Sequence, residues 1–421
     1  MLGALLLLLA PLAQTAAPAP APVVAESEHY HLVAYPPFDA SAEYLALAEA
    51  LYAQLERYFG AQPAHEGKLE VRFWPTVEGY HQGGLSDGIP EPSLASGGIY
   101  WTGTSVAYFW RQPSESFTRH LFLHELTHQF QFLSVMHNQG RAPDWYNEGL
   151  AEQFGYHHWD GATLETGEDD VLGLELDIPR MSEQGRAGTY DVCAVVEGSA
   201  GAGKPTSWAA VHYLLSGPDA ELTRRFRALE PRIWSGELRG AELVRALFGA
   251  DRAAARDAVN RWLASLRTTW QIEWIHWDSR GADLVGESGV VALVRTRAVY
   301  EHGGQIQATL HEESGSAGLV LAFRSTSDFL ALYRRPGGRL ELVQRTSAGW
   351  KTLAAADGPA GASVELAAQI SDSGSLRVRA GGEERLRLEL GEQAAHGAFG
   401  LFSDAGRTRF SGIALPSDPR R

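Results

Sequence analysis

Residues 119–154 read RHLFLHELTHQFQFLSVMHNQGRAPDWYNEGLAEQF, and the rest of the chain is interpreted relative to this stretch. It contains the pattern His-Glu-x-x-His at His124, Glu125 and His128. Glu148 follows twenty positions after His128, in a second, acidic segment. Side chains of these types at this spacing predict a zinc site with an acid–base residue beside it.

The spacing carries a geometric argument. Histidines four positions apart on a helix project from the same face, so His124 and His128 can both reach one Zn²⁺ at about 2.0–2.1 Å. Glu125 directly follows the first histidine, which puts its carboxylate beside the metal, where it can accept a proton from water. A catalytic zinc keeps three protein ligands and one open position. Glu148 is the predicted third ligand.

Two helices are expected in this stretch. Residues 114–133 contain no Gly or Pro, begin with a serine that can cap a helix, and carry apolar residues on nearly every side. Such a helix belongs in the interior, where polar side chains are costly unless they are paired or bind a metal. The second helix is expected to run from Asp144 to Phe154, with Glu148 and Glu152 one turn apart.

The residues alone leave alternatives open. A chance His-Glu-x-x-His would make the histidines hydrogen-bonded core residues and Glu125 a partner of Arg119 or a solvated acid. Asn147 and Glu152 are candidates for a supporting role, in which they accept the second ring N–H of His124 or His128 and fix its tautomer. The alternative for Glu152 is an ordinary solvated acid on a helix face.

HELTH followed by NEGLAE resembles the gluzincin metallopeptidases, the thermolysin-like or peptidase-MA-like group. The resemblance implies Zn²⁺ held by His124, His128 and Glu148, with Glu125 as general base and later proton shuttle. It also implies a peptide or protein substrate.

The same resemblance implies that Asn147 and Glu152 orient the histidines, although Glu152 stands where the group usually has Asp. A peptidase of this type also needs an electrophile for the oxyanion, usually a Tyr or His from a helical lobe. The sequence favours none of its four candidates, which are Tyr190, Lys204, His212 and Tyr213.

The first 25 residues are interpreted as an export signal and an Ala/Pro spacer. Residues 5–10 form a short apolar core, and small residues at 15–17 offer a cleavage site. The apolar run is too short to span a bilayer, so no transmembrane segment is expected. The single cysteine, Cys193, excludes an intramolecular disulfide. Together these features indicate export to a bacterial periplasm or to the exterior.

Length and composition allow more than one core, since the chain has 421 residues of which 44% are apolar. A formal net charge of −15 disfavours nucleic acid or an anionic membrane as a partner. We expect an α+β metallopeptidase domain over residues 26–270, with a mixed sheet before the metal helix and a helical lobe after it. The helices expected in the lobe are 207–215, 221–229, 241–247 and 252–266.

Beyond residue 275 the helical period gives way to alternating strands separated by Gly-rich turns. This pattern predicts an all-β jelly-roll sandwich over residues 275–421. The expected strands are 290–300, 305–311, 318–323, 329–334, 340–345, 363–370, 375–380, 384–390, 397–403 and 408–413.

The closing segment, GAFGLFSDAGRTRFSGIAL at 397–415, resembles the last two strands of concanavalin-A-like and laminin-G-like jelly rolls, with Gly400-Leu401-Phe402 and Phe410 in matching positions. The resemblance implies a module for glycan or for a surface protein. The alternative is a packing domain without a ligand.

The sequence therefore predicts an exported zinc-dependent peptidase with a β-sandwich behind it. The alternative is a non-catalytic or degenerate gluzincin scaffold that serves as a surface glycan- or protein-binding protein. The substrate, the choice between internal and terminal cleavage, the ligand of the jelly roll and the oligomeric state stay open.

Overall fold

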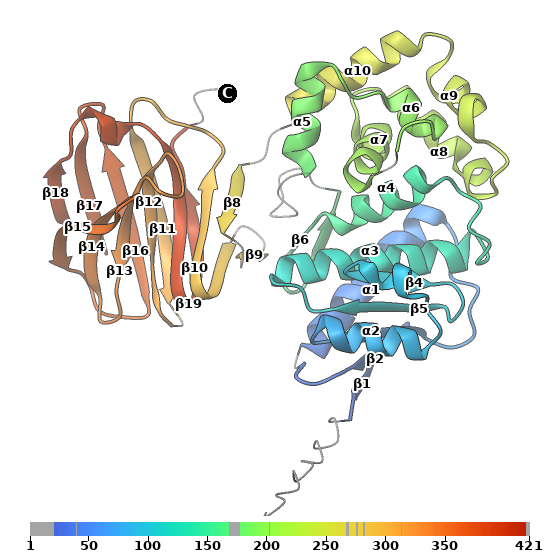
Figure 1. Cartoon of the computed structure of the whole chain (residues 1–421), viewed down its shortest axis with the longest axis horizontal. Helices are drawn as coiled ribbons and strands as arrows, with labels where there is room; N and C mark the ends of the chain where they lie inside the picture. The colour runs from blue at the N-terminus through green and yellow to red at the C-terminus, as the bar shows by residue number, and fades with distance from the viewer. Residues whose placement is uncertain are drawn as a thin grey trace, which may run out of the picture.

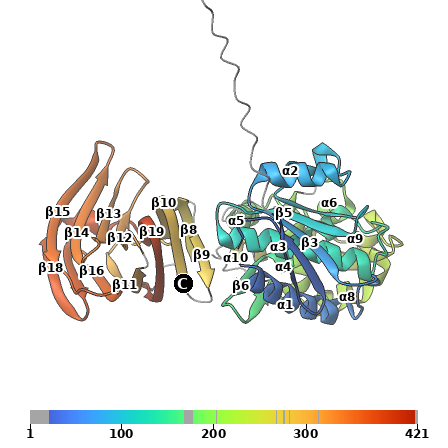
Figure 2. The same cartoon turned by 90° about the horizontal axis from the view of Figure 1, so that it is seen from below.

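The computed structural model describes residues 21–417 apart from 39, 168–176, 202, 267–268, 275–276, 281–282 and 313. The chain forms an α+β N-terminal part and a C-terminal β-sandwich, which lie side by side (Figures 1 and 2). The predicted export signal lies almost entirely outside the described residues. Within them, no helix is both long and apolar enough to cross a bilayer.

The N-terminal part begins with a five-stranded sheet. Its strand order is β1 (Val23–Glu26), β2 (Tyr30–Ala34), β3 (Leu69–Trp74), β5 (Val106–Trp110) and β4 (Gly98–Trp101). The central strands β2, β3 and β5 are parallel, and β1 and β4 pair antiparallel at the two edges. The connections contain α1 (Ser41–Phe59), α2 (Val77–Ser86) and a 3₁₀ turn, η1 (Glu91–Ala95). The edge position of β4 matters for the site, because α3 packs beside it.

The two predicted helices are present as α3 (Glu115–Ser134) and α4 (Asp144–Gly155). The Ser114 hydroxyl caps α3 by accepting the N–H of Phe117 at 3.1 Å. A short hairpin, β6 (His157–Trp159) and β7 (Leu164–Thr166), leads into the helical lobe. The lobe consists of α5 (Asp177–Ala187), α6 (Val192–Glu197), α7 (Lys204–Ser216), α8 (Ala220–Trp234), α9 (Gly240–Phe248) and α10 (Arg252–Ser265).

One continuous core joins the sheet, α3 and the lobe. It contains Leu51 of α1, Phe73 of β3, Leu126 of α3 and Trp208 of α7, all buried. Figure 1 shows α3 and α4 between the sheet on one side and the lobe on the other. Gly149 lets α4 approach α7 closely, because a Cβ there would lie 2.4 Å from the carbonyl oxygen of Ser207. The burial of α3 agrees with its apolar residues on all sides.

The C-terminal part is a sandwich in which two long strands run through both layers. These are β10 (Asp283–Thr296) and β19 (Ala398–Ala414). The first half of β19 pairs with β12 and its second half with β11, while β10 pairs with both halves. The other strands are β8 (Trp270–Trp274), β9 (Trp277–Arg280), β11 (Gly304–Glu312), β12 (Ser316–Phe323), β13 (Phe329–Arg334), β14 (Arg339–Thr346), β15 (Gly349–Asp357), β16 (Ser363–Ile370), β17 (Ser375–Ala380) and β18 (Glu383–Glu389), with a 3₁₀ turn, η2 (Glu392–Ala395).

Two expectations about the sandwich were wrong in detail. The last two predicted strands are one strand, β19. The turn expected between them is an irregularity within this strand at Asp404-Ala405-Gly406, where Ala405 adopts a φ of +52°. Strands β8, β9 and β15 were not expected. Most side chains of β15 are exposed or half-buried, so its sequence lacks a strong alternation.

The sandwich is joined to the N-terminal part through β9. Asp278 is buried and accepts hydrogen bonds from both terminal nitrogens of Arg119 on α3. The contact between the two parts therefore includes a buried ion pair at α3.

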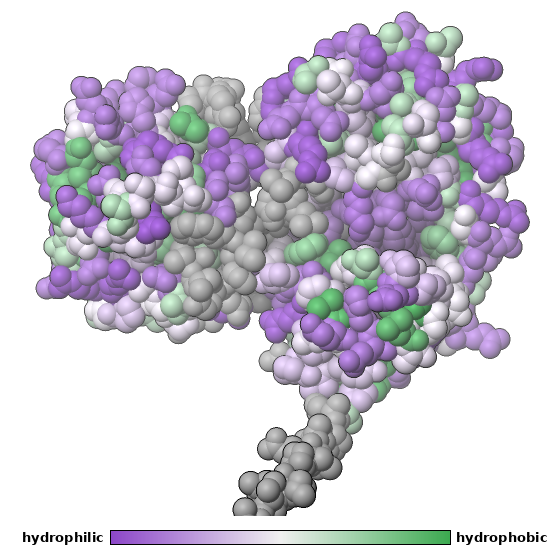
Figure 3. All heavy atoms as spheres, viewed as in Figure 1, coloured by the Kyte–Doolittle hydropathy of each residue, from purple (hydrophilic) through white to green (hydrophobic). Residues whose placement is uncertain are grey.

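Figure 3 shows hydrophilic residues over most of the visible face of both parts, with hydrophobic residues in small patches.

Candidate metal centre

Helices α3 and α4 bring the three predicted ligands together. The Nε2 atoms of His124 and His128 are 3.1 Å apart. Glu148 of α4 places its Oε2 3.5 Å from Nε2 of His124 and its Oε1 3.6 Å from Nε2 of His128. Donors bound at 2.0–2.1 Å to one tetrahedral ion stand about 3.3–3.4 Å apart. The distances among the three side chains are close to this spacing, with one carboxylate oxygen of Glu148 facing each histidine, so the three could hold one metal ion.

The chemistry of this donor set also fits a metal. Two imidazole nitrogens and one carboxylate oxygen suit zinc and other first-row divalent ions. Both histidines are buried, and their facing nitrogens gain little from each other because an imidazole nitrogen must be deprotonated to accept. A cation between them resolves that conflict. Zinc in particular stays a prediction.

Glu152 lies where a supporting residue is expected. Its Oε1 is 3.2 Å from Nδ1 of His124, the ring nitrogen that faces away from the other ligands. Its Oε2 is 3.0 Å from Nε2 of His120. Burial raises the pKa of Glu152, but the charges of His120 and His124 outweigh it and hold that pKa well below its usual value. Glu152 is therefore buried as a carboxylate between two histidines.

Sequence reasoning missed His120. This residue stands four positions before His124, so His120, His124 and His128 form a row along one face of α3. The spacing of four between these histidines is the sequence signal that indicates His120. His120, His124 and Glu152 form a second group that could hold a metal ion, directly behind the first. Its geometry agrees equally well with a purely supporting role.

Asn147 is engaged elsewhere. Its Oδ1 accepts from Nε2 of Gln131 at 3.2 Å, and its Nδ2 donates to the carbonyl oxygen of Ala142 at 3.3 Å. These bonds join α3 to α4, and α4 to the loop that precedes it. The role predicted for Asn147 beside a ligand histidine stays a prediction.

Glu125 lies beside the donor set in a buried position against β4. Its Oε2 accepts the backbone N–H of Tyr100 at 2.6 Å. A Cβ on Gly98 would lie 3.0 Å from Cγ of Glu125, so the glycine leaves room for this side chain. Burial raises the pKa of Glu125, although the charges of His124 and Lys204 oppose the rise. A buried carboxylate with a raised pKa is suited to accept and return a proton.

Of the four candidate electrophiles, Lys204 is the one that reaches the cluster. It is the first residue of α7, and its Nζ lies 3.3 Å from Nε2 of His124 and 3.6 Å from Oε1 of Glu152. The other three side chains contact residues outside the cluster. The Tyr190 hydroxyl donates to the carbonyl of Thr206, His212 pairs with Gln153, and Tyr213 packs against Trp262.

The pKa values of the three predicted ligands shift in different directions. Burial and the charge of Lys204 lower the pKa of His124, but Glu152 and Glu148 outweigh them and raise it to about 9. Burial and the charge of His124 lower the pKa of His128 to about 3. Burial raises the pKa of Glu148, but its hydrogen bond to His124 and the charges of both histidines outweigh this and bring it to about 2. A bound cation would replace the proton on His124.

Comparison with known proteins finds similar structures for the sandwich, and the similarity is one of fold. No model of a known protein family matches the chain, and no curated protein matches it. A carbohydrate binding module, CBM66 from Bacillus subtilis, is similar at 11% identity and a TM-score of 0.32, covering 36% of this chain and 96% of that one.

Two further solved structures are similar. The carbohydrate recognition domain of Emp46p in its metal-free form has 9% identity and a TM-score of 0.29, covering 35% of this chain and 88% of its own. The exoplasmic/lumenal domain of VIP36 in its Ca²⁺/Man-bound form has 10% identity and a TM-score of 0.28, covering 36% and 90%. None of these comparisons supports the gluzincin resemblance, which rests on the sequence pattern.

Proposed function

We propose that this protein is a zinc-dependent hydrolase that cleaves peptide bonds. One observation carries the proposal: Nε2 of His124 and Nε2 of His128 lie 3.1 Å apart, and each lies 3.5–3.6 Å from one carboxylate oxygen of Glu148, beside the buried carboxylate of Glu125. A bound zinc ion supplies a Lewis acid that polarises a carbonyl and makes water more acidic. The residues of this chain would supply the remaining chemistry.

Glu125 is the general base in this proposal. Its carboxylate takes a proton from water as the water attacks the scissile carbonyl, and it then delivers that proton to the leaving amine. The N–H of Tyr100 holds the carboxylate in place at 2.6 Å. Glu152 holds His124 from behind, at 3.2 Å from its Nδ1.

A peptide is the substrate class that the surroundings of Glu125 favour. Strand β4 is an edge strand of the five-stranded sheet, and it runs directly beside this carboxylate. An extended peptide can pair with a strand edge through its backbone. At β4 the N–H of Tyr100 is used by Glu125 and the carbonyl of Gly98 by the Ser96 hydroxyl, so the pairing would use other backbone groups of the strand. Such pairing would hold a peptide alongside the general base.

The test is cleavage of an unbiased peptide mixture by the zinc-loaded full chain, read by mass spectrometry. Metal content is measured on the same sample. Cuts that vanish on removal of the metal and return with zinc would support a zinc peptidase. A chain that binds one zinc ion and leaves all peptides intact would contradict the proposal.

Lys204 is proposed to stabilise the oxygen that gains negative charge as water adds to the carbonyl. Lys204→Met is expected to lower kcat about 10²-fold, the cost of losing one such electrostatic contact. The same change should tighten zinc binding, because it removes a positive charge next to His124. Both are measured, kcat with a cleaved peptide and zinc affinity by chelator competition. Lys204→Arg keeps the charge and serves as the control; an unchanged kcat in Lys204→Met would remove the assigned role.

A second candidate function, carbohydrate binding by the sandwich, is favoured by one exposed tryptophan. Trp350 of β15 is 44% exposed. It stands over buried aromatic rings on the same face of the sheet, with ring centroids 5.4 Å away for Phe329, 5.9 Å for Tyr333 and 6.2 Å for Phe402. The guanidinium of Arg345 lies over this ring, 5.2 Å from its centroid. A half-exposed aromatic ring held by such neighbours offers an apolar platform for a sugar. Carbohydrate is also the ligand class that the names of similar solved structures carry.

Trp350→Ala is expected to weaken binding of a neutral oligosaccharide to the full chain about tenfold, because the stacking platform is lost. A glycan array selects the oligosaccharide, and titration calorimetry measures its affinity. Lys351→Ala is the matched control, since the neighbouring residue on the strand points to the opposite face. Equal affinity of the two variants would show that Trp350 is not the platform.

A further inference from the structure

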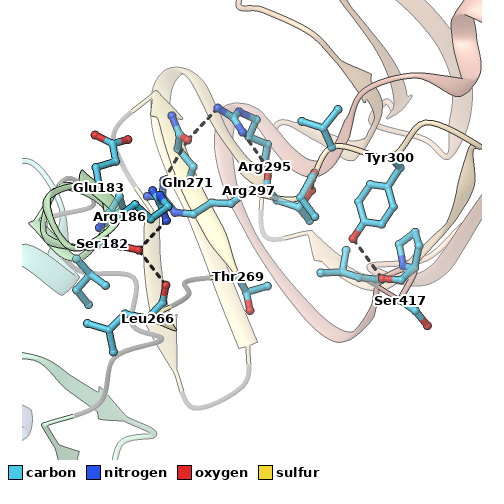
Figure 4. A pocket seen from close by; sticks show the side chains of 17 residues that line it. Ser182, Glu183, Arg186, Leu266, Thr269, Gln271, Arg295, Arg297, Tyr300 and Ser417 are labelled. Carbon is cyan, nitrogen blue, oxygen red and sulfur yellow. Dashed lines mark hydrogen bonds between the residues drawn. The ribbon is translucent and has the colours of Figure 1, made fainter. Parts of the chain in front are cut away.

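A pocket lies between helix α5 of the N-terminal part and the sandwich (Figure 4). Its volume is about 1090 Å³. Residues from α5, from the segment that enters β8, from the end of β10 and from the chain after β19 line it. None of the candidate metal-centre residues is among them, so this is a separate site.

The lining is basic in an acidic protein. Three arginines and one glutamate, Glu183, contribute a formal charge of +2, whereas the chain as a whole carries −15. The arginines come from both sides: Arg186 stands on α5, and Arg295 and Arg297 belong to the sandwich. In the view of Figure 4, Arg186 and Arg297 extend toward each other across the pocket. Anionic groups are the natural counterpart of such a lining.

Two of the guanidinium groups converge on one neutral atom. Oε1 of Gln271 accepts from Nη2 of Arg295 at 2.8 Å and from Nη1 of Arg297 at 3.3 Å. Arg295 also pairs with Glu273 at 2.7 Å. Arg186 donates to the Ser182 hydroxyl at 2.9 Å, and it forms no ion pair with any residue that the structure describes. Arg295 is thus already paired with a carboxylate, whereas Arg186 is exposed and available to a bound anion.

The lining also has an aliphatic part, beside the polar residues Ser182, Thr269, Gln271, Thr296 and Ser417. Val299 is 55% exposed, and Ile178, Leu266, Leu415 and Pro416 complete this wall. Among the described lining residues, the one aromatic side chain is Tyr300, which is buried. A saccharide would be expected to meet an exposed flat ring, whereas aliphatic side chains beside guanidinium groups match a peptide that carries both aliphatic and acidic residues.

We propose that this pocket binds an acidic peptide segment. Carboxylates of the segment pair with Arg186 and Arg297, and its aliphatic side chains pack on the wall around Val299. Because the lining comes from both parts of the chain, the bound peptide bridges them. The proposal does not depend on the hydrolase activity.

The test uses a fluorescein-labelled peptide of alternating Leu and Glu and measures fluorescence anisotropy with the full chain. The chain carries Glu125→Gln, so that the peptide stays intact whether or not the protein is a peptidase. The Leu/Glu peptide is expected to bind, and its Leu/Gln counterpart to bind at least about tenfold more weakly. Adding Arg186→Gln should weaken Leu/Glu binding about tenfold.

The control is Arg224→Gln, which removes an exposed arginine of α8 that pairs with Glu221 far from the lining. It should leave the affinity unchanged. Absence of binding, or equal binding by the Arg186→Gln and Arg224→Gln variants, would overturn the proposal. So would oligogalacturonate binding that depends on Arg186 while the peptide fails to bind, because the ligand would then be an acidic sugar.

Discussion

Glu125→Gln is expected to lower the rate of peptide cleavage about 10³-fold while one metal ion per chain stays bound. Gln has the shape of Glu, and its amide oxygen can still accept the N–H of Tyr100, so the packing against β4 is preserved. The amide cannot take a proton from water at neutral pH. The measurements are kcat with a cleaved peptide and metal content by mass spectrometry.

The control for this prediction separates the base from the ligands. His124→Ala and His128→Ala remove donors that lie 3.1 Å apart, and both variants should lose the metal as well as the activity. One zinc ion per chain in either variant would contradict the assignment of that histidine as a ligand. Near-normal turnover in Glu125→Gln would mean that another group takes the proton, and would contradict the role of Glu125.

Local pattern was sufficient to predict the helices of the candidate site. A helix expected over 114–133 is found at Glu115–Ser134, and one expected over 144–154 is found at Asp144–Gly155. Capping residues, the apolar period and helix-breaking residues all act within a few positions, so the local sequence is enough to predict the helix. The approach of Glu148 to the histidines follows from the pairing of those two helices.

Contacts between distant segments could not be predicted in the same way. Lys204 lies 80 positions after His124, and no local pattern says that the start of α7 reaches the cluster. Helix α2 was also missed. It contains Gly79, Gly83 and Gly84, and Gly83 is needed because a Cβ there would lie 2.2 Å from the ring of Trp74. Tertiary packing outweighs helix propensity at such positions.

The sandwich shows both outcomes. Strands β13, β16 and β17 have the predicted bounds, because each is a clean alternation or apolar run between turn residues. Strand β9 could not be predicted, since one of its buried residues, Asp278, is acidic and stands next to the buried Trp277. An acid is buried there only because Arg119, 159 positions earlier, comes to meet it.

Asp278→Ala is expected to destabilise the chain by about 3–5 kcal/mol. Arg119 is fully buried, and its Nη1 lies 3.2 Å from Oδ2 of Asp278, with a second bond from Nη2 to Oδ1. Removing the carboxylate leaves the guanidinium in a low-dielectric interior without its main counter-charge. Glu43 stands farther off, with its Oε1 4.0 Å from Nη1 of Arg119, and Nε of Arg119 lies 3.4 Å from Nε2 of His157. Urea unfolding measures the loss as a lower transition midpoint.

Two further variants make the Asp278 prediction specific. Asp283→Ala breaks the half-exposed pair with Arg409 on the sandwich and should cost no more than about 1 kcal/mol. The double variant Arg119→Met with Asp278→Leu removes both charges and should recover most of the stability, because burying an unpaired charge is what costs energy. Arg119 precedes His120 on α3, and His120 contacts Glu152, which in turn contacts His124. Asp278→Ala should therefore also weaken metal binding, and the double variant should restore it. If Asp278→Ala lowers the free energy of unfolding no more than Asp283→Ala does, the ion pair does not hold β9 against α3.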